Sequence, residues 1–108
     1  MIEKPRIRLP KQARKGEIIQ IKTLVSHIME NGQRRDRNGN IIPRKIINEF
    51  TCEFNGRPVF SCELDTAIAE NPYLEFAARM AESGTFQFTW RDDDGSTITA
   101  EETIVVIP

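Results

Sequence analysis

Apolar and polar residues alternate along most of this 108-residue chain. Every second residue is apolar in segments 6–9 and 19–22, and again in segments 50–54 and 60–64. A period of two places the apolar side chains of a strand on one face, where a core can bury them. The pattern therefore predicts β-strands that each turn one face toward a hydrophobic core.

Segments 50–54 and 60–64 are predicted to form a hairpin around Asn55-Gly56. A two-residue loop would pair Phe54 with Arg57 and would turn Phe60 and Cys62 to the polar side. A three-residue loop, with Gly56 in the left-handed conformation of a bulged turn, keeps apolar residues opposite apolar residues. We therefore predict the three-residue loop.

Residues 73–81 fit two different elements. Leu, Glu, Ala, Arg and Met are strong helix formers, and Ser83-Gly84 is a typical helix stop. Leu74, Phe76, Ala78 and Met80, however, also alternate as one face of a strand. The residues alone leave helix and strand open for this segment.

The alternation continues to the end of the chain. Phe86, Phe88 and Trp90 form a further apolar face, residues 92–95 form a turn, and residues 98–107 supply a last strand. Short strands at regular spacing with turns between them are typical of a β-sandwich. We predict an all-β fold: one immunoglobulin-like antiparallel β-sandwich domain of about seven strands over residues 1–108.

Composition fits a soluble globular domain, with 39% hydrophobic residues. The longest apolar run, residues 104–107, is far shorter than the ~20 residues of a membrane-spanning helix. Residues 1–16 are basic but contain no apolar block, so they do not form an export signal. Taken alone, the residues place the protein in the cytoplasm.

The net charge is −1, but its distribution is uneven. Residues 1–48 hold twelve Lys and Arg against four acidic residues, while residues 49–108 hold three Arg against twelve. Strands of opposite charge can neutralise each other across a sheet, or a basic face can steer an anionic group toward a partner. Nucleic acid is set aside, since the sequence pI is ≈ 5.9 and no recognition motif is present.

The sequence contains little that could carry chemistry. A metal site of the reductase type found in some immunoglobulin-like domains needs several histidines, and His27 is the only one. His27 has no nucleophile or carboxylate at a motif spacing. Residues 92–95 lack the spacing of a calcium loop and are interpreted as a solvated turn. No catalytic, metal-binding or cofactor-binding residue is predicted, and no cofactor.

Cys52 and Cys62 are predicted to be free, buried thiols. In the three-residue register Cys62 lies opposite Phe50 or Asn48, so the two cysteines are at least one diagonal step apart, farther than a disulfide spans. A disulfide stays open if the two strands belong to opposite sheets. Neither cysteine has the neighbours of an activated thiol.

Several segments resemble the SoxZ family, one half of the SoxYZ sulfur-compound carrier of the bacterial sulfur-oxidising (Sox) system. The resemblance is carried by Ser26-His27-Ile28-Met29-Glu30-Asn31-Gly32-Gln33-Arg34, Ile42-Pro43-Arg44-Lys45-Ile46-Ile47-Asn48, Lys22-Thr23-Leu24, Phe54-Asn55-Gly56-Arg57-Pro58-Val59-Phe60, Asn71-Pro72-Tyr73-Leu74 and Ser83-Gly84-Thr85-Phe86-Gln87-Phe88-Thr89-Trp90. These segments occur in the family's order and span almost the whole chain. The resemblance also indicates that residues 73–81 form a strand rather than a helix.

The resemblance implies a non-catalytic subunit that binds SoxY and helps to present its thiol-bound sulfur intermediates to Sox enzymes in thiosulfate oxidation. The substrate-bearing cysteine is expected on a mobile Gly-Gly-Cys-Gly-Gly end of SoxY. The resemblance further implies a periplasmic location, reached by co-export with a signal-bearing SoxY, and transient contacts with other Sox proteins. The alternative, from another class, is a small thiol-dependent redox or sulfur-transfer enzyme that uses Cys52 or Cys62.

Four segments are apolar on both strand faces: Ile18-Ile19, Ile41-Ile42, Ile46-Ile47 and residues 104–107. One side of each has no place in a single core, so we expect a partner to cover an apolar surface, and the isolated chain to form homodimers or larger species. The candidate partner-contact residues are His27, Met29, Arg34, Arg44, Ile47 and Val105.

Overall fold

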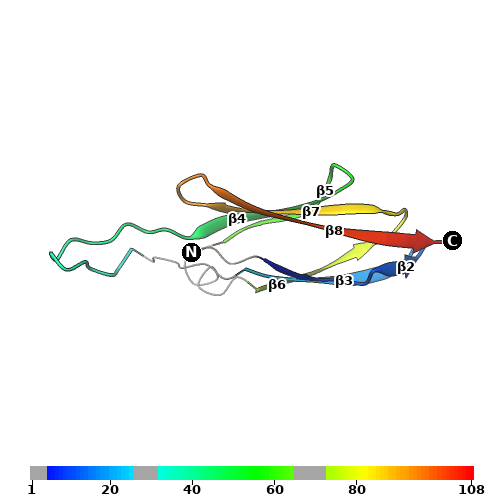
Figure 1. Cartoon of the computed structure of the whole chain (residues 1–108), viewed down its shortest axis with the longest axis horizontal. Coiled ribbons are helices and arrows are strands. Elements are labelled where there is room, and N and C mark those ends of the chain that lie inside the picture. The colour runs from blue at the N-terminus through cyan, green and yellow to red at the C-terminus, as the bar shows by residue number, and fades with distance from the viewer. Residues whose placement is uncertain (1–4, 26–31, 65–72) are drawn as a thin grey trace.

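The computed structural model describes residues 5–25, 32–64 and 73–108, and these segments form eight β-strands and no helix (Figure 1). The strands are β1 (Arg6–Arg8), β2 (Gln12–Arg14), β3 (Ile18–Leu24), β4 (Ile47–Phe54), β5 (Arg57–Glu63), β6 (Tyr73–Arg79), β7 (Gly84–Asp92) and β8 (Thr97–Ile107). The all-β prediction is confirmed. The described segments contain no helix with the length and apolar character that crossing a membrane requires.

The strands form two sheets that lie face to face. One sheet has the order β1-β3-β6, and the other has the order β2-β8-β7-β4-β5. All neighbours are antiparallel except β2 and β8, which are parallel. Strand β2 is the element that the alternation did not predict: the chain leaves the first sheet after β1, adds three residues to the edge of the second, and returns as β3.

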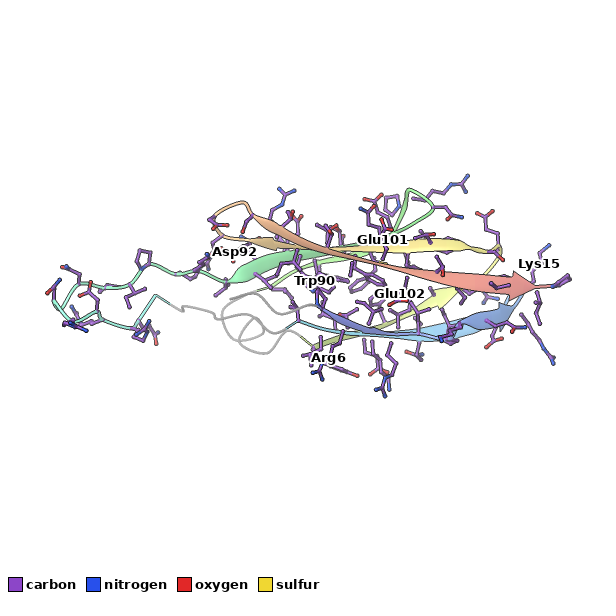
Figure 2. The ribbon with its side chains drawn as sticks, viewed as in Figure 1. Arg6, Lys15, Trp90, Asp92, Glu101 and Glu102 are labelled. Atoms are coloured by element: carbon purple, nitrogen blue, oxygen red, sulfur yellow. The ribbon has the colours of Figure 1, made fainter. Side chains whose placement is uncertain are left out.

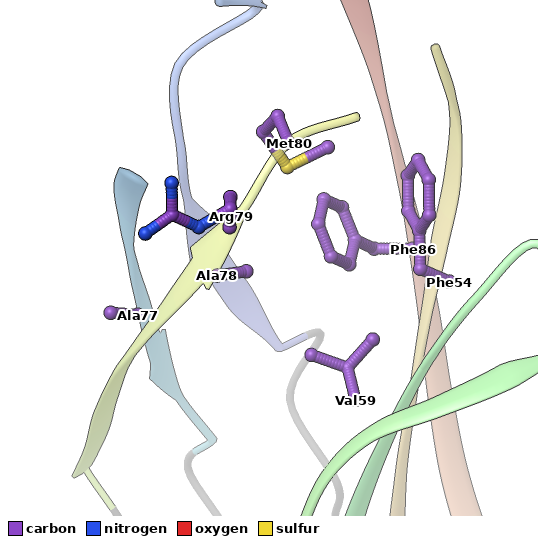
Figure 3. Close-up of a pocket in the computed structure, with 7 residues that line it drawn as sticks. All are labelled: Phe54, Val59, Ala77, Ala78, Arg79, Met80 and Phe86. Carbon is purple, nitrogen blue, oxygen red and sulfur yellow. The ribbon is translucent and has the colours of Figure 1, made fainter. Parts of the chain in front are cut away.

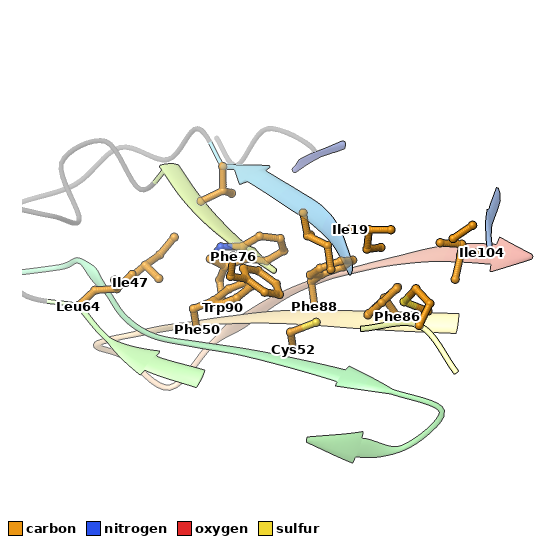
Figure 4. Close-up of a cluster of buried hydrophobic side chains, with 14 of the residues drawn as sticks. Ile19, Ile47, Phe50, Cys52, Leu64, Phe76, Phe86, Phe88, Trp90 and Ile104 are labelled. Atoms are coloured by element: carbon orange, nitrogen blue, oxygen red, sulfur yellow. The ribbon is translucent and has the colours of Figure 1, made fainter. Parts of the chain in front are cut away.

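Aromatic side chains from both sheets meet in the core between them (Figure 4). Phe50, Phe88 and Trp90 of the five-stranded sheet are fully buried, and the rings of Phe50 and Trp90 lie 5.2 Å apart. Phe60 of β5 stacks on Phe76 of β6 at 4.6 Å and so joins the two sheets at one side. Each such side chain contributes about 1.5–3 kcal/mol through burial, so this cluster dominates the stability of the sandwich.

The β4–β5 hairpin corrects one prediction. The loop has two residues, Asn55 and Gly56, both with positive φ, and Phe54 pairs with Arg57. The predicted three-residue loop is therefore wrong. The predicted pairing of apolar with apolar residues is nevertheless present, because a β-bulge leaves Val59 without an opposite residue and brings Phe60 opposite Cys52.

The strand favoured for residues 73–81 is confirmed as β6. Phe76 lies opposite Ile21 of β3 and is buried, while Glu75 and Ala77 are exposed. The helix-forming composition does not decide this segment, because the ladder with β3 and the burial of its alternate side chains outweigh a propensity of a few tenths of a kcal/mol per residue.

Candidate partner interface

Residues 32–45, named the arm from here on, extend away from the sandwich and return to the start of β4 (Figure 1). The arm contributes to the elongated dimensions of the molecule, 62 × 19 × 19 Å. Its two sides pair with each other: the Ile42 amide donates to the Arg34 carbonyl at 2.8 Å, and Arg35 bridges to Ile41. The arm is therefore a small hairpin of its own.

A carboxylate organises the tip of the arm. Asp36 Oδ1 accepts hydrogen bonds from the amides of Asn38 and Asn40, both at 2.9 Å. Gly39 adopts a positive φ at the turn, and Arg35 Nη1 donates to its carbonyl at 2.8 Å. These bonds satisfy the backbone of the turn within the arm itself.

The root of the arm is fixed to the β7–β8 turn by Asp93. Arg44 donates to both carboxylate oxygens of Asp93 at 2.9 Å, Asn48 Nδ2 donates to Oδ1 at 2.9 Å, and the Ile46 amide donates to Oδ2 at 3.1 Å. The Asp93 amide in turn donates to the Ile46 carbonyl at 2.9 Å. We name Asp93 with Arg44, Ile46 and Asn48 the root clamp.

The electrostatics of the root clamp follow from these contacts. Burial by itself raises the pKa of Asp93, but the hydrogen bonds from Arg44, Asn48 and the Ile46 amide, with the charge of Arg44, hold the pKa below its usual value. The neighbouring Asp94 has its pKa lowered to about 2, chiefly by hydrogen bonds from Ser96, and it lies 3.4 Å from Lys45 Nζ. Both carboxylates are charged at neutral pH.

The sequence pattern gives Asp93 no role, because residues 92–95 have the composition of a solvated turn. One signal points to it in hindsight. Residues 44, 46 and 48 alternate along an extended segment, and a guanidinium, an amide N–H and a carboxamide on one side of that segment form a converging set of donors. Such a set of donors requires an acceptor. Only the folded chain shows that the acceptor is the carboxylate of Asp93 and not another one.

The predicted partner-contact residues lie in different places. His27 and Met29 fall outside the described residues. Arg34 is exposed on the arm, and Val105 is exposed on β8, with 56% of its surface accessible. Arg44 belongs to the root clamp, and its guanidinium is bound to the Asp93 carboxylate of the same chain.

The structure corrects the prediction that Ile47 contacts a partner. Ile47 is fully buried in the core, as is Ile46, so neither isoleucine of this pair remains for a partner (Figure 4). The reason is an irregularity in the β4–β7 pairing between Ile47 and Glu49, which turns Ile47 inward. In the pairs Ile18-Ile19 and Ile41-Ile42, one isoleucine is exposed as predicted: Ile18 has 56% of its surface accessible and Ile41 has 55%.

The outer faces of the two sheets differ in charge (Figure 2). The exposed residues of the three-stranded sheet combine basic and apolar side chains with one acid: Arg6, Arg8, Ile18, Gln20, Lys22, Tyr73, Glu75, Ala77 and Arg79. The outward residues of the five-stranded sheet are mainly Thr and Glu, with two arginines: Gln12, Arg14, Glu49, Thr51, Glu53, Ser61, Glu63, Thr85, Gln87, Thr89, Arg91, Thr97, Thr99, Glu101, Thr103 and Val105. The uneven charge along the sequence thus becomes two faces of opposite sign.

An apolar hollow opens at the side of the sandwich, between β5 and β6 (Figure 3). Val59, Met80 and Phe86 face one another there, while the guanidinium of Arg79 points away. Its other lining residues are Phe54, Ala77 and Ala78. The hollow offers no acid, base or nucleophile, so it can hold apolar groups but cannot perform chemistry.

The two thiols are free and lie on neighbouring strands, Cys52 opposite Phe60 and Cys62 opposite Phe50. Burial, with the nearby charge of Glu53, raises the pKa of Cys52 to about 12. Burial also raises the pKa of Cys62. Since the thiolate is the reactive form, both cysteines are poor nucleophiles at neutral pH. Within the described segments, no group of three or more His, Cys, Asp or Glu side chains could hold a metal ion.

Comparison with protein families decides the family. The model of the family described as sulphur oxidation protein SoxZ matches residues 7–103. The chain belongs to the SoxZ family. The SoxZ resemblance of the sequence is thereby confirmed, and the role of this chain lies within sulfur oxidation by a Sox system. A search of curated protein sequences gives no match.

Solved structures share the fold of this SoxZ chain. The sulfur carrier protein SoxY from Chlorobium limicola f. thiosulfatophilum matches with a TM-score of 0.69 and 14% identity, over 96% of this chain and 79% of SoxY. The superoxide reductase (neelaredoxin) from Ignicoccus hospitalis matches with a TM-score of 0.74 and 14% identity, over 98% of this chain and 82% of the reductase. At such identities the likeness concerns the fold alone, and it supports the immunoglobulin-like sandwich.

Proposed function

We propose that this chain is the non-catalytic subunit of a SoxYZ-type carrier complex. It binds a SoxY-like subunit as a heterodimer, and the complex presents sulfur intermediates bound to the SoxY thiol to Sox enzymes during thiosulfate oxidation. The observation that carries the proposal is the SoxZ family match over residues 7–103. Exposed apolar side chains lie on three parts of the surface: Ile18 and Tyr73 on the three-stranded sheet, Ile41 on the arm and Val105 on the five-stranded sheet.

A non-catalytic role agrees with the chemistry of the side chains. The chain contains one histidine, and the pKa values of both cysteines are raised rather than lowered. A thiol-dependent redox or sulfur-transfer enzyme is the second candidate, and it is favoured by one observation: Cys62 is only partly buried and lies beside Glu49, Thr51, Ser61 and Glu63 at an open hollow. Neighbouring carboxylates oppose a thiolate, so the carrier role is preferred.

The direct test is a binding measurement with purified SoxY-like subunit, followed by light scattering coupled to gel filtration. We expect the chain alone to form homodimers or larger species, and the mixture to form a one-to-one complex. A chain that stays monomeric, with no change in mass when SoxY is added, contradicts the proposal.

Activity assays separate the two candidates. The isolated chain should show no turnover of thiosulfate, sulfide or persulfide substrates. Steady turnover that disappears in the Cys62→Ser variant would establish the thiol enzyme instead.

Location is part of the proposal. We propose that the protein works in the periplasm and crosses the membrane bound to a signal-bearing SoxY. Cell fractionation with and without the SoxY gene tests this: the chain should reach the periplasm only when SoxY is made, and a periplasmic pool that is independent of SoxY contradicts co-export.

A further inference from the structure

The arm carries an unusual concentration of positive charge for a protein of net charge −1. Residues 32–45 contain five basic residues, Arg34, Arg35, Arg37, Arg44 and Lys45, and one acidic residue, Asp36. Asp93 and Asp94 offset Arg44 and Lys45 at the root. The outer half of the arm also carries Arg35 and Arg37 on either side of one carboxylate, Asp36, and that carboxylate accepts hydrogen bonds from the tip backbone.

The arm has a defined shape before any partner is present. A two-stranded hairpin by itself is only marginally stable in water. Here the local hydrogen bonds at Asp36 hold the tip, and the root clamp joins the other end to the β7–β8 turn through a bidentate ion pair. A segment that is already ordered loses less conformational entropy on binding, so this arrangement favours recognition.

An apolar side chain lies among these charges. Ile41 is opposite Arg35 in the arm hairpin and has 55% of its surface exposed. The next residue, Ile42, is partly buried, so the arm turns one isoleucine outward and one inward. An apolar centre with a charged rim is the composition of a protein–protein interface.

The charges on the rest of the surface bear on how a charged partner approaches. The outer face of the five-stranded sheet is acidic, with Glu49, Glu53, Glu63 and Glu101, so it repels an acidic surface. The arm attracts the same surface. The basic outer face of the three-stranded sheet attracts it as well, so the three regions together turn the acidic face away from an acidic partner.

We propose that the arm is the docking element of this subunit, and that it fits an acidic surface of the SoxY-like partner, with Ile41 at the centre of the contact and Arg35 and Arg37 at its rim. Asp93 is a positioning residue: it does not touch the partner but holds the arm at the angle that docking requires. This inference rests on the proposed function, and the wild-type chain tests that function separately.

The first test reverses charge on the arm. In titration calorimetry with the purified SoxY-like subunit, the double variant Arg35→Glu with Arg37→Glu should bind about tenfold more weakly or worse, and the salt dependence of its binding should decrease. The matched control is Lys15→Glu with Arg57→Glu, which makes the same charge change at two exposed positions away from the arm, Lys15 in the turn after β2 and Arg57 at the start of β5. The control should bind within about twofold of wild type.

The outcomes separate the two proposals. If the wild-type chain does not bind SoxY, the proposed function fails and docking by the arm fails with it. If the wild type binds while the arm variant and the control are weakened equally, or not at all, only docking by the arm is overturned. An Ile41→Ser variant that binds as well as wild type overturns the central role of Ile41. Val59→Ser, at an exposed position of β5, is its matched control on the sandwich.

The second test concerns Asp93. Asp93→Asn keeps the shape of the side chain and removes its charge, so the arm should lose order while the sandwich keeps it. Amide hydrogen exchange should speed up at Asp36, Asn40 and Ile42, stay unchanged in β7, and slow down again when SoxY is added. Weaker SoxY binding with an unchanged exchange rate in the arm contradicts the positioning role, and so does faster exchange throughout the sandwich.

Discussion

The sandwich and the arm are stabilised by different forces. In the sandwich, fully buried side chains such as Phe50, Phe88 and Trp90 account for the cohesion, and they are neutral. In the arm, the described contacts are hydrogen bonds and ion pairs around two carboxylates, Asp36 and Asp93. The sandwich should therefore respond to changes of volume and polarity in its core, whereas the arm should respond to charge, salt and pH. One chain thus combines a body held by apolar packing with an arm held by polar contacts.

The strongest way to break the sandwich is to place a charge inside it. Ile47→Lys should lower the free energy of unfolding by roughly 4 kcal/mol or more, since the side chain is fully buried and a charge there loses its hydration. Val105→Lys makes the same change at an exposed position and should stay within about 0.5 kcal/mol of wild type. Urea denaturation compares the two. Equal losses would show that Ile47 is not a core residue.

A subtler change tests the close packing at the end of the sandwich. A Cβ atom at Gly84 would collide with the carboxamide of Asn55, which accepts a hydrogen bond from the Thr85 amide. Gly84→Ala should therefore cost about 1–3 kcal/mol in thermal or urea unfolding. Asn55→Gly tolerates the positive φ and removes the obstacle, so the double variant should cost less than the sum of the single ones. Additive costs would exclude the collision as the cause.

Acid should loosen the arm before the sandwich. The pKa of Asp93 is lower in the folded chain than in the unfolded one, so its stabilising effect is complete above the unfolded value and is lost as pH falls through the folded one. We expect the amide signal of Ile46 to shift below about pH 4, while core signals from β7 stay constant. In Asp93→Asn the Ile46 shift should disappear. Simultaneous loss of arm and core signals would contradict independent behaviour.

The smallest expected effect is a difference between the alkylation rates of the two thiols, and measuring it requires no substitution. Both should react slowly in the native state at neutral pH, Cys52 more slowly than Cys62, because its pKa is raised to about 12 and it is almost fully buried. In urea the two rates should converge. Intact mass spectrometry follows the reaction, and a gain of protons on reduction alone would reveal a disulfide and contradict the observed register.

Much of the sandwich follows from sequence alone. The alternating faces of residues 50–54, 60–64 and 86–90 predict the strands β4, β5 and β7, and their inward residues form the core. Alternation is a local property, because a strand with one apolar face has only one way to hide that face from water. The same argument explains why the short β2 was missed: three residues with a single buried alanine carry too little pattern to detect.

Register and long-range contacts were decided by the tertiary structure. The bulge at Val59 allowed a two-residue loop and apolar pairing together, and the irregularity beside Ile47 buried an isoleucine that the pattern left for a partner. Asp93 holds Arg44 across 49 positions of sequence. The sequence shows which side chains must be buried and which donors need an acceptor. Which partner each one finds depends on how the two sheets twist and pack, because these contacts form only when distant segments have been brought together.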